Sequence, residues 1–246
     1  FLMKISMGLI LVVFFVLSPI LFYFLYKYRG KKSNKAYFFS HNNKLEVVWT
    51  VVPTIILTVF IIFGLKTWDK AMNVDVTQST KIIEVYAQQF YWSARYSGDD
   101  NILGKANYKL VKEKNIFGVD TLDINFADDK MTKEVHLVVD QPVLLKFRSQ
   151  DVIHSAFLPH FRVQMNCVPG ITTQFGFTPT KTTAQMKETE GEDFEYILLC
   201  NKICGQAHYN MQMKVIVETQ EEFDIWFASK QNLENRLLTK KEDKDV

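Results

Sequence analysis

Cysteine is scarce in this chain of 246 residues, which holds only three, at positions 167, 200 and 204. A number this small and odd excludes a fold that depends on a framework of disulfides. Net charge is also small, at +2, so composition gives no reason to expect a nucleic-acid partner. The mean hydropathy of −0.04 is too low for a polytopic membrane protein and too high for a disordered chain. The length fits one domain of ordinary size with additional elements.

Acidic residues are nearly absent from the first 66 positions, which contain eight Lys and Arg but a single acid, Glu46. Two runs there, residues 5–26 and 47–65, carry no charge at all. As helices they would measure about 33 Å and about 29 Å, and each is long enough to cross a bilayer. A cleaved signal peptide and a buried core helix are the alternatives. The lengths favour a transmembrane hairpin with helices over about 5–28 and 46–66.

The segment between the two runs is strongly basic. Its positive residues are Lys27, Arg29, Lys31, Lys32, Lys35 and Lys44. The positive-inside rule keeps such a loop in the cytoplasm, so we expect a two-pass membrane protein with both termini, and the whole segment after about residue 67, outside the cytoplasm. Glu46 lies at the cytoplasmic edge of the second helix. It is either an acid favoured by the helix dipole or a proton-uptake group that faces a partner subunit.

The chain after residue 68 predicts an all-β domain. Residues 81–96 are rich in β-branched and aromatic side chains and are typical of one long strand or two short ones. Several short strands without intervening helices are typical of a sandwich or a Greek-key barrel. Further strands are predicted over 134–149, 162–167, 172–177, 194–199 and 212–218, with an irregular insertion over 97–133, a closing helix over 220–238 and a disordered end over 240–246. The predicted parts are a transmembrane hairpin over 1–68, a β domain over 69–230 and a C-terminal tail over 231–246.

Soft metal ligands are concentrated in one short segment near the C-terminal end. Its Cys204, His208 and Met211 have the spacing Cys-x3-His-x2-Met, which is typical of the ligand loop of a mononuclear copper site in a β-sandwich. A second imidazole must come from an earlier strand, and we expect His154, at the end of the strand through Phe147, to supply it. Thiolate, imidazole and thioether together suit copper far better than magnesium or calcium.

Cys200 makes the site more specific, because a mononuclear copper site needs only one thiolate. Two cysteines four residues apart can each bridge two copper ions. His154 and His208 would then cap one ion each, with Met211 as a weak ligand to one copper and a backbone carbonyl to the other. Two alternatives remain open, a disulfide between Cys200 and Cys204 and a zinc site with the two histidines. Met211 and the strand-rich context disfavour zinc.

The third cysteine and the other histidines have simpler explanations. Cys167 precedes a Val-Pro-Gly turn on an apolar strand, and we expect a buried, inert thiol there. His136 is expected to be an ordinary strand residue. The spacing of His160 does not argue for a ligand, and His41 falls in the basic loop.

Several features follow one another in a fixed order along the chain. They are the two N-terminal apolar runs, Gln89-Phe90-Tyr91-Trp92-Ser93, Val152-Ile153-His154-Ser155, the segment 165–170 and the loop Cys-x3-Cys-x3-His-x2-Met. Together they resemble subunit II of the haem–copper cytochrome c oxidases. The resemblance implies a two-helix hairpin followed by a cupredoxin domain. It implies a dinuclear copper centre, CuA, held by His154, Cys200, Cys204, His208, Met211 and the main-chain carbonyl of Lys202.

The resemblance also implies a route for electrons and protons. Electrons would come from a cytochrome c-type donor, free, tethered or part of a larger complex, and pass to haem a of subunit I, where O₂ is reduced to water with proton pumping. Phe90 stands where the family usually has the exposed Trp that receives the electron, and Tyr91 and Trp92 are further candidates. Glu46 matches the family's acid at the mouth of a proton channel.

Two further positions depart from the family pattern. Lys202 stands where an acid usually helps to bind magnesium at the interface with subunit I, and an ammonium group cannot ligate Mg²⁺. Asn166 stands where an aspartate is common. The intact ligand loop argues against a copper-free quinol-oxidase subunit. The absence of a βαβ pattern argues against a copper-delivery thiol protein, and the two-helix anchor argues against nitrous oxide reductase.

Overall fold

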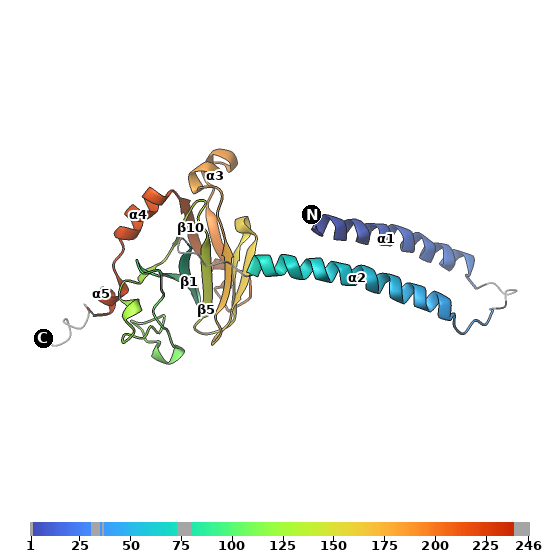
Figure 1. Ribbon diagram of the computed structural model, residues 1–246, viewed down its shortest axis with the longest axis horizontal. Coiled ribbons are helices and arrows are strands. Elements are labelled where there is room, and N and C mark those ends of the chain that lie inside the picture. Colours follow the sequence, from blue (N-terminus) through green and yellow to red (C-terminus); the bar gives the residue numbers. More distant parts are fainter. Residues whose placement is uncertain (1, 31–34, 36, 73–79, 239–246) are drawn as a thin grey trace. The chain divides into compact units, whose positions relative to one another are not determined.

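The computed structural model describes residues 2–30, 35, 37–72 and 80–238 (Figure 1). Contacts divide the chain into two compact units, Phe1–Lys70 and Ala71–Val246. The predicted disordered end over 240–246 lies outside the described residues, as do Lys31 and Lys32 of the basic loop.

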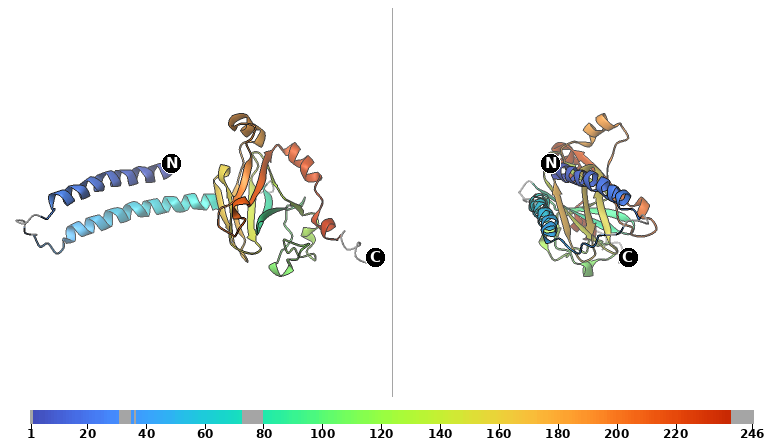
Figure 2. Two further views of the ribbon diagram at one scale, coloured as in Figure 1. Left: turned by 180° about the vertical axis from the view of Figure 1, so that it is seen from behind. Right: turned by 90° about the vertical axis from the view of Figure 1, so that its right-hand side faces the viewer.

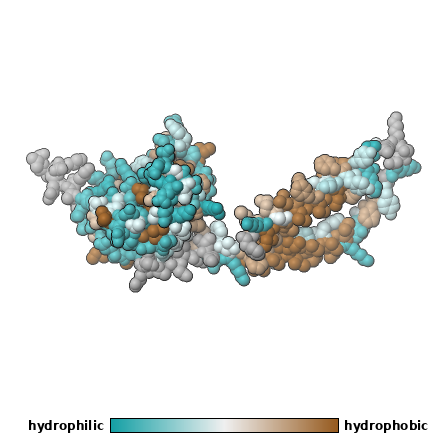
Figure 3. Space-filling view, turned by 90° about the horizontal axis from the view of Figure 1, so that it is seen from above, coloured by the Kyte–Doolittle hydropathy of each residue, from teal (hydrophilic) through white to brown (hydrophobic). Residues whose placement is uncertain are grey.

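The first unit contains two long helices, α1 (Leu2–Lys27) and α2 (Asn43–Met72). Both are long and apolar enough to cross a membrane, and none of their apolar windows is buried inside the protein. Figure 3 shows apolar side chains along both helices. The predicted pair of helices is confirmed. α1 begins earlier and α2 ends later than predicted, because a charged side chain beyond the apolar run does not interrupt the backbone hydrogen bonds of a helix.

Side chains cap the N-terminus of α2. The Leu45 N–H donates to the side-chain oxygen of Asn42 at 3.1 Å, and the Asn42 N–H donates to the Glu46 carboxylate at 3.2 Å. Such bonds satisfy backbone groups that the first turn of a helix leaves without partners. Glu46 therefore stabilises its own helix start, independently of any role toward a partner subunit.

The second unit is a sandwich of two five-stranded sheets (Figures 1 and 2). Their strand orders are β3-β2-β1-β5-β8 and β4-β10-β9-β6-β7. The strands are β1 (Lys81–Gln88), β2 (Tyr91–Tyr96), β3 (Lys130–Thr132), β4 (Val135–Val138), β5 (Val143–Ser149), β6 (His154–Leu158), β7 (Val163–Cys167), β8 (Thr173–Phe177), β9 (Tyr196–Cys200) and β10 (Gln212–Glu218). β1 pairs with β5 in parallel, and so does β4 with β10. Parallel neighbours need a long connection, so the chain passes through the opposite sheet between them.

The main hydrophobic core fills the space between the two sheets. Its largest fully buried side chains are Ile83, Tyr96, Leu137, Leu145, Phe147, Leu158, Leu198, Met211 and Phe223. Burying a side chain of this size stabilises a fold by about 1.5–3 kcal/mol. The predicted all-β domain is confirmed, and the core includes Met211, a predicted copper ligand.

One predicted strand was wrong. The strand expected over 134–149 is two strands, β4 and β5, which belong to opposite sheets. The chain turns between them because Asp140 adopts the left-handed region, with φ 59°, and Pro142 follows it. For the segment 81–96 the sequence predicted either one long strand or two short ones. The structure has two short strands, β1 and β2.

The helices of the second unit also differ from the prediction. The single closing helix expected over 220–238 is two helices, α4 (Gln220–Ala228) and α5 (Leu233–Leu238). The sequence analysis also missed α3 (Thr183–Glu190). This helix begins with a capping box in which Thr182 and Gln185 bond reciprocally. The capping pair was the signal in the sequence for this helix. None of its residues is buried, so it has no apolar face that a periodic pattern could reveal.

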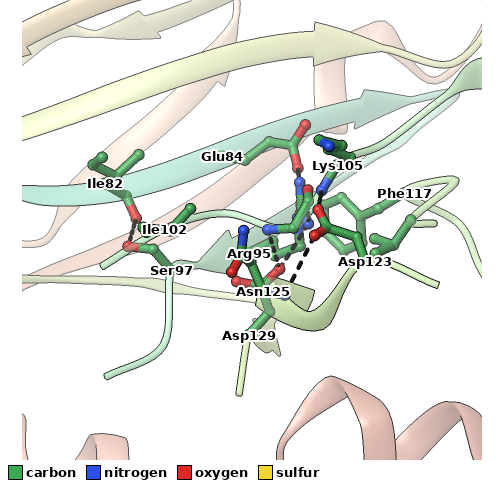
Figure 4. A network of polar contacts seen from close by, with 12 residues as sticks. Ile82, Glu84, Arg95, Ser97, Ile102, Lys105, Phe117, Asp123, Asn125 and Asp129 are labelled. Carbon is green, nitrogen blue, oxygen red and sulfur yellow. Dashed lines mark hydrogen bonds and ion pairs between the residues drawn. The ribbon is translucent and has the colours of Figure 1, made fainter. Parts of the chain in front are cut away.

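A buried ion network fastens the insertion over 97–133 to the sandwich (Figure 4). Arg95 of β2 pairs with Glu84 of β1 and with Asp129, at N–O distances of 2.7 Å. Arg148 of β5 pairs with the other carboxylate oxygen of Glu84, also at 2.7 Å. Burial raises the pKa of Asp129 to about 7, although Arg95 acts in the opposite direction. Charges from three strands and the insertion therefore meet inside the protein.

The insertion also has a small apolar cluster of its own. Phe117, Val119 and Phe126 pack there with Tyr86 of β1 and Leu233 of α5. The Leu233 N–H donates to the Asp129 carbonyl at 2.6 Å. α5 therefore closes over the insertion (Figure 1).

Candidate metal centre

Two neighbouring strands bring the predicted copper ligands together. β9 ends at Cys200, β6 begins at His154, and the two strands pair with Ala156 opposite Cys200. The loop after β9 returns to β10, which begins directly after Met211. Backbone bonds close this loop, because the Cys200 N–H donates to the Met211 carbonyl at 3.0 Å. The sheet hydrogen bonds themselves therefore set the spacing of the ligands.

The ligand atoms form one compact group. The ring Nδ1 of His154 lies 3.7 Å from the sulfur of Cys200, and the ring Nδ1 of His208 lies 3.6 Å from the sulfur of Cys204. The two cysteine sulfurs are 3.9 Å apart. The Met211 sulfur lies 3.7 Å from that of Cys204. Ligand atoms of His154, Cys200 and Cys204 lie within 4.8 Å of one another, which is close enough to share metal ions.

The main-chain carbonyl of Lys202 completes the group. Its oxygen lies 3.3 Å from the sulfur of Cys200. The Lys202 side chain is exposed, and so is that of Ile203, at 86%. The loop therefore turns this carbonyl inward and these two side chains outward. The residue type at 202 does not affect the carbonyl.

The donor chemistry fits copper. Both cysteines are free, and burial, with a further effect of the Cys200 thiol, raises the pKa of Cys204 to about 11. A metal that binds here must therefore displace a proton, as thiolate-binding metals do. Two sulfurs, two imidazoles, a thioether and a carbonyl exceed the four ligands of a structural zinc site. The set is consistent with a copper site.

The sequence analysis placed His154 on the wrong strand. It does not lie at the end of the strand through Phe147, which is β5 in the first sheet. It opens β6 in the second sheet, because residues 150–153 carry the chain across from one sheet to the other. Its side chain is completely buried. His208, by contrast, is half-buried at the edge of the site.

The three aromatic candidates for electron input differ in exposure. Tyr91 is 46% exposed, and Trp92 is 3% exposed. The Trp92 ring packs edge-on against His154 at 6.1 Å between ring centroids, and its N–H donates to the Met211 carbonyl at 3.4 Å. Phe90 is half-buried, and its ring lies so close to Gly205 that a Cβ added there would be 2.7 Å away. Phe90 and Trp92 thus contact the metal loop.

Two residues of the site were missed in the sequence. Asp151 accepts a hydrogen bond from the Nε2–H of His154 at 2.9 Å and one from the Gln89 N–H at 2.7 Å. The Gln89 side chain in turn donates to the Cys204 carbonyl. An acid three residues before a ligand histidine was an available signal, because such histidines usually donate their second N–H to a carboxylate or carbonyl.

Cys167, His136 and His160 pack within the β domain, away from any role as ligands. Cys167 is fully buried opposite His154 on β7, as predicted, and burial raises its pKa to about 12. His136 lies in β4 and stacks on Trp226 with 3.7 Å between ring centroids. His160 packs against Phe194 rather than the metal ligands.

Comparison with known families covers both units of the chain. Residues 1–67 match the family model described as cytochrome c oxidase subunit II, transmembrane domain. Residues 81–219 match the model described as cytochrome c oxidase subunit II, periplasmic domain. The chain belongs to the cytochrome c oxidase subunit II family. It is therefore a membrane protein of the haem–copper oxidases, and its second unit is the family's copper domain.

Individual relatives agree with this assignment. The chain is 30% identical over 208 residues to the alternative cytochrome c oxidase subunit 2 of Bradyrhizobium diazoefficiens, covering 83% of this chain and 70% of that protein. It is 27% identical over 234 residues to the probable cytochrome c oxidase subunit 2 of Rickettsia felis, covering 94% of this chain and 65% of that protein. Among solved structures, it is similar to the periplasmic domain of cytochrome oxidase subunit II of Bradyrhizobium japonicum, with 23% identity, a TM-score of 0.42, and coverage of 63% of this chain and 95% of that one.

Proposed function

We propose that this chain is the subunit of a terminal haem–copper oxidase that receives electrons, through a dinuclear CuA centre. The ligands are His154, Cys200, Cys204, His208, Met211 and the main-chain carbonyl of Lys202. The observation that carries the proposal is the arrangement of two cysteine sulfurs 3.9 Å apart, each with an imidazole nitrogen within 3.7 Å. A mononuclear site would need only one of these sulfurs.

The residues around the ligands serve fast electron transfer. Two copper ions held by both cysteines, both histidines and Met211 would supply one-electron redox chemistry. The protein keeps the ligands in place through the bond between Cys200 and the Met211 carbonyl and through burial of His154 and Met211. Ligands that do not move between oxidation states keep the reorganisation of the site small.

The proposed partners follow from the family. Electrons arrive from a cytochrome c-type donor, free, tethered or held in a larger complex, and leave for haem a of subunit I, where O₂ is reduced to water with proton pumping. Phe90, Tyr91 and Trp92 are the candidates for electron input, and Glu46 is the candidate at the mouth of a proton channel. The copper domain and both termini lie on the periplasmic side of a bacterial inner membrane, because the basic loop between the helices stays in the cytoplasm.

The interface with subunit I would differ from that of the family in one respect. Lys202 carries a positive charge where a carboxylate would bind magnesium, so this residue is no magnesium ligand. A buried ammonium without a partner would cost several kcal/mol or lose its proton. We propose that Lys202 forms a direct ion pair with a carboxylate or a haem propionate of subunit I.

The decisive experiment counts copper and examines its spectrum. The purified full-length chain, loaded with copper, should hold two ions and show an electron paramagnetic resonance spectrum of one electron shared by two copper nuclei. Cys200→Ser should reduce this to one ion held by Cys204, His154, His208 and Met211. Cys167→Ser is the matched control, because it removes a buried thiol beside the site, and it should leave two ions. A single copper in the unaltered chain would contradict the proposal.

A further inference from the structure

The turn between β1 and β2 is bonded to both halves of the ligand group. Its Gln89 contributes a backbone N–H to Asp151 and a side-chain amide to the Cys204 carbonyl. Phe90, the next residue, packs its ring on Gly205 of the metal loop. Cys204 belongs to the loop after β9, whereas Asp151 precedes β6. This turn therefore spans the two segments that carry the ligands.

Asp151 is placed to control the His154 ring. The ring directs Nδ1 toward the Cys200 sulfur at 3.7 Å, so its Nε2–H points the opposite way and donates to Asp151 at 2.9 Å. Asp151 also accepts bonds from the backbone N–H groups of Gln89 and Val152, both at 2.7 Å.

A carboxylate on the far nitrogen of a ligand imidazole has two physical effects. It selects the tautomer whose free nitrogen faces the metal, and it makes that nitrogen a stronger donor. A stronger donor favours the oxidised state of a bound metal over the reduced state. The stronger donation by the imidazole nitrogen requires the negative charge of the carboxylate. An amide in its place would still accept the hydrogen bond from the ring but would carry no charge.

We infer that Asp151 and Gln89 are positioning residues that couple the electron-input turn to the metal ligands, with Asp151 lowering the reduction potential of the site through His154. The inference rests on the proposed copper function and deepens it. Asp151 acts on the histidine, and Gln89 acts on the loop. The turn that carries Phe90 thus cannot shift without changing the support of His154 and Cys204.

The test compares three variants of the full-length chain, with and without copper. Asp151→Asn keeps the size of the side chain and removes its charge. Asp193→Asn removes the same charge at an exposed position on the same domain. Gln89→Leu removes the bond to the Cys204 carbonyl and keeps the backbone N–H that Asp151 accepts. Urea unfolding of each variant shows first whether the domain is still folded.

The copper-loaded forms report the electronic effect. Asp151→Asn should weaken copper binding by about 10–100-fold and should raise the reduction potential. If the variant loses ten times more affinity for oxidised copper than for reduced copper, the reduction potential rises by about 59 mV for a one-electron couple. Asp193→Asn should change neither quantity. Gln89→Leu should weaken binding by less than Asp151→Asn and leave the potential close to that of the unaltered chain. Equal potentials for Asp151→Asn and Asp193→Asn would overturn the inference.

The copper-free forms separate this inference from the proposed function. The Nε2 proton of His154 should exchange slowly with water in the nitrogen-15 spectrum of the unaltered chain, and much faster in Asp151→Asn. If the unaltered chain bound a single copper, the proposed function would fail while this proton would still report on Asp151. If exchange were equally fast in both chains, the inference would fail whatever the copper content.

Discussion

Replacing Arg95 by methionine should be among the most damaging single changes in the copper domain that spare the metal ligands. The Arg95 side chain is 3% exposed and pairs at 2.7 Å with both Glu84 and Asp129. Without it, Glu84 keeps its ion pair with Arg148. Asp129 keeps only the Gly104 N–H at 3.0 Å, and its other oxygen has no hydrogen-bond partner among the described residues. At a pH where Asp129 is ionised, stranding its buried charge in this way costs about 3–5 kcal/mol of unfolding free energy.

The loss should depend on pH in a defined direction. Burial raises the pKa of Asp129 in the folded protein to about 7, above its unfolded value of 3.8. The stability that this carboxyl contributes is therefore fully present below the unfolded pKa and is lost as the pH rises through about 7. Removing Arg95 takes away the cation that lowers this pKa, so it rises further. The damage should then be larger at pH 8.5 than at pH 6.

Urea unfolding of the copper domain, followed by tryptophan fluorescence at both pH values, measures this effect. Arg95→Met combined with Asp129→Asn should recover much of the loss, because no unpaired charge remains. Lys214→Met is the matched control, since Lys214 pairs with Glu195 at 2.8 Å but both side chains are about half exposed. It should cost less than about 1 kcal/mol. A loss for Arg95→Met as small as that, or one equal at the two pH values, would refute the reasoning.

Two further predictions concern the metal loop. Gly205→Ala should displace the Phe90 ring and destabilise the domain more than Gly170→Ala, because both glycines have positive φ but only Gly205 has atoms within 4 Å of an added Cβ; equal losses in urea unfolding would contradict this. Lys202→Met should leave the copper spectrum unchanged and slow electron transfer from copper to haem a in the assembled oxidase, measured by flash photolysis. A structure with magnesium at that interface and Lys202 turned into water would contradict the ion pair.

The sequence predicted the two helices, and it predicted which residues of the loop would lie together, because both depend on local information. An uncharged run of about 20 residues indicates a membrane helix by its length and composition alone. The ligands in the loop lie within twelve residues of one another, so their spacing can be recognised in the sequence without knowledge of the fold. The predicted set, including the carbonyl of Lys202, lies together in the structure.

Tertiary pairing was harder to predict. β4 and β5 read as one strand because both are apolar, and only their assignment to opposite sheets separates them. The placement of His154 was wrong for the same reason. Gln89 lies 115 positions before Cys204, whose carbonyl it bonds. The sequence around either residue does not predict such a contact. The ion network of Arg95 also joins residues from distant segments, so no spacing rule could have assembled it.

The two parallel strand pairs have a consequence for the order in which the copper domain folds. β1 pairs with β5, and β4 pairs with β10, so each pair joins strands that are far apart in the sequence. β10 begins only after the metal loop. Contacts between such distant segments form slowly, because their loop-closure entropy must be overcome first. Cys200 and Met211 are held together only once β10 has paired with β9. The complete ligand set, including His154, would therefore be assembled only after these strands have paired.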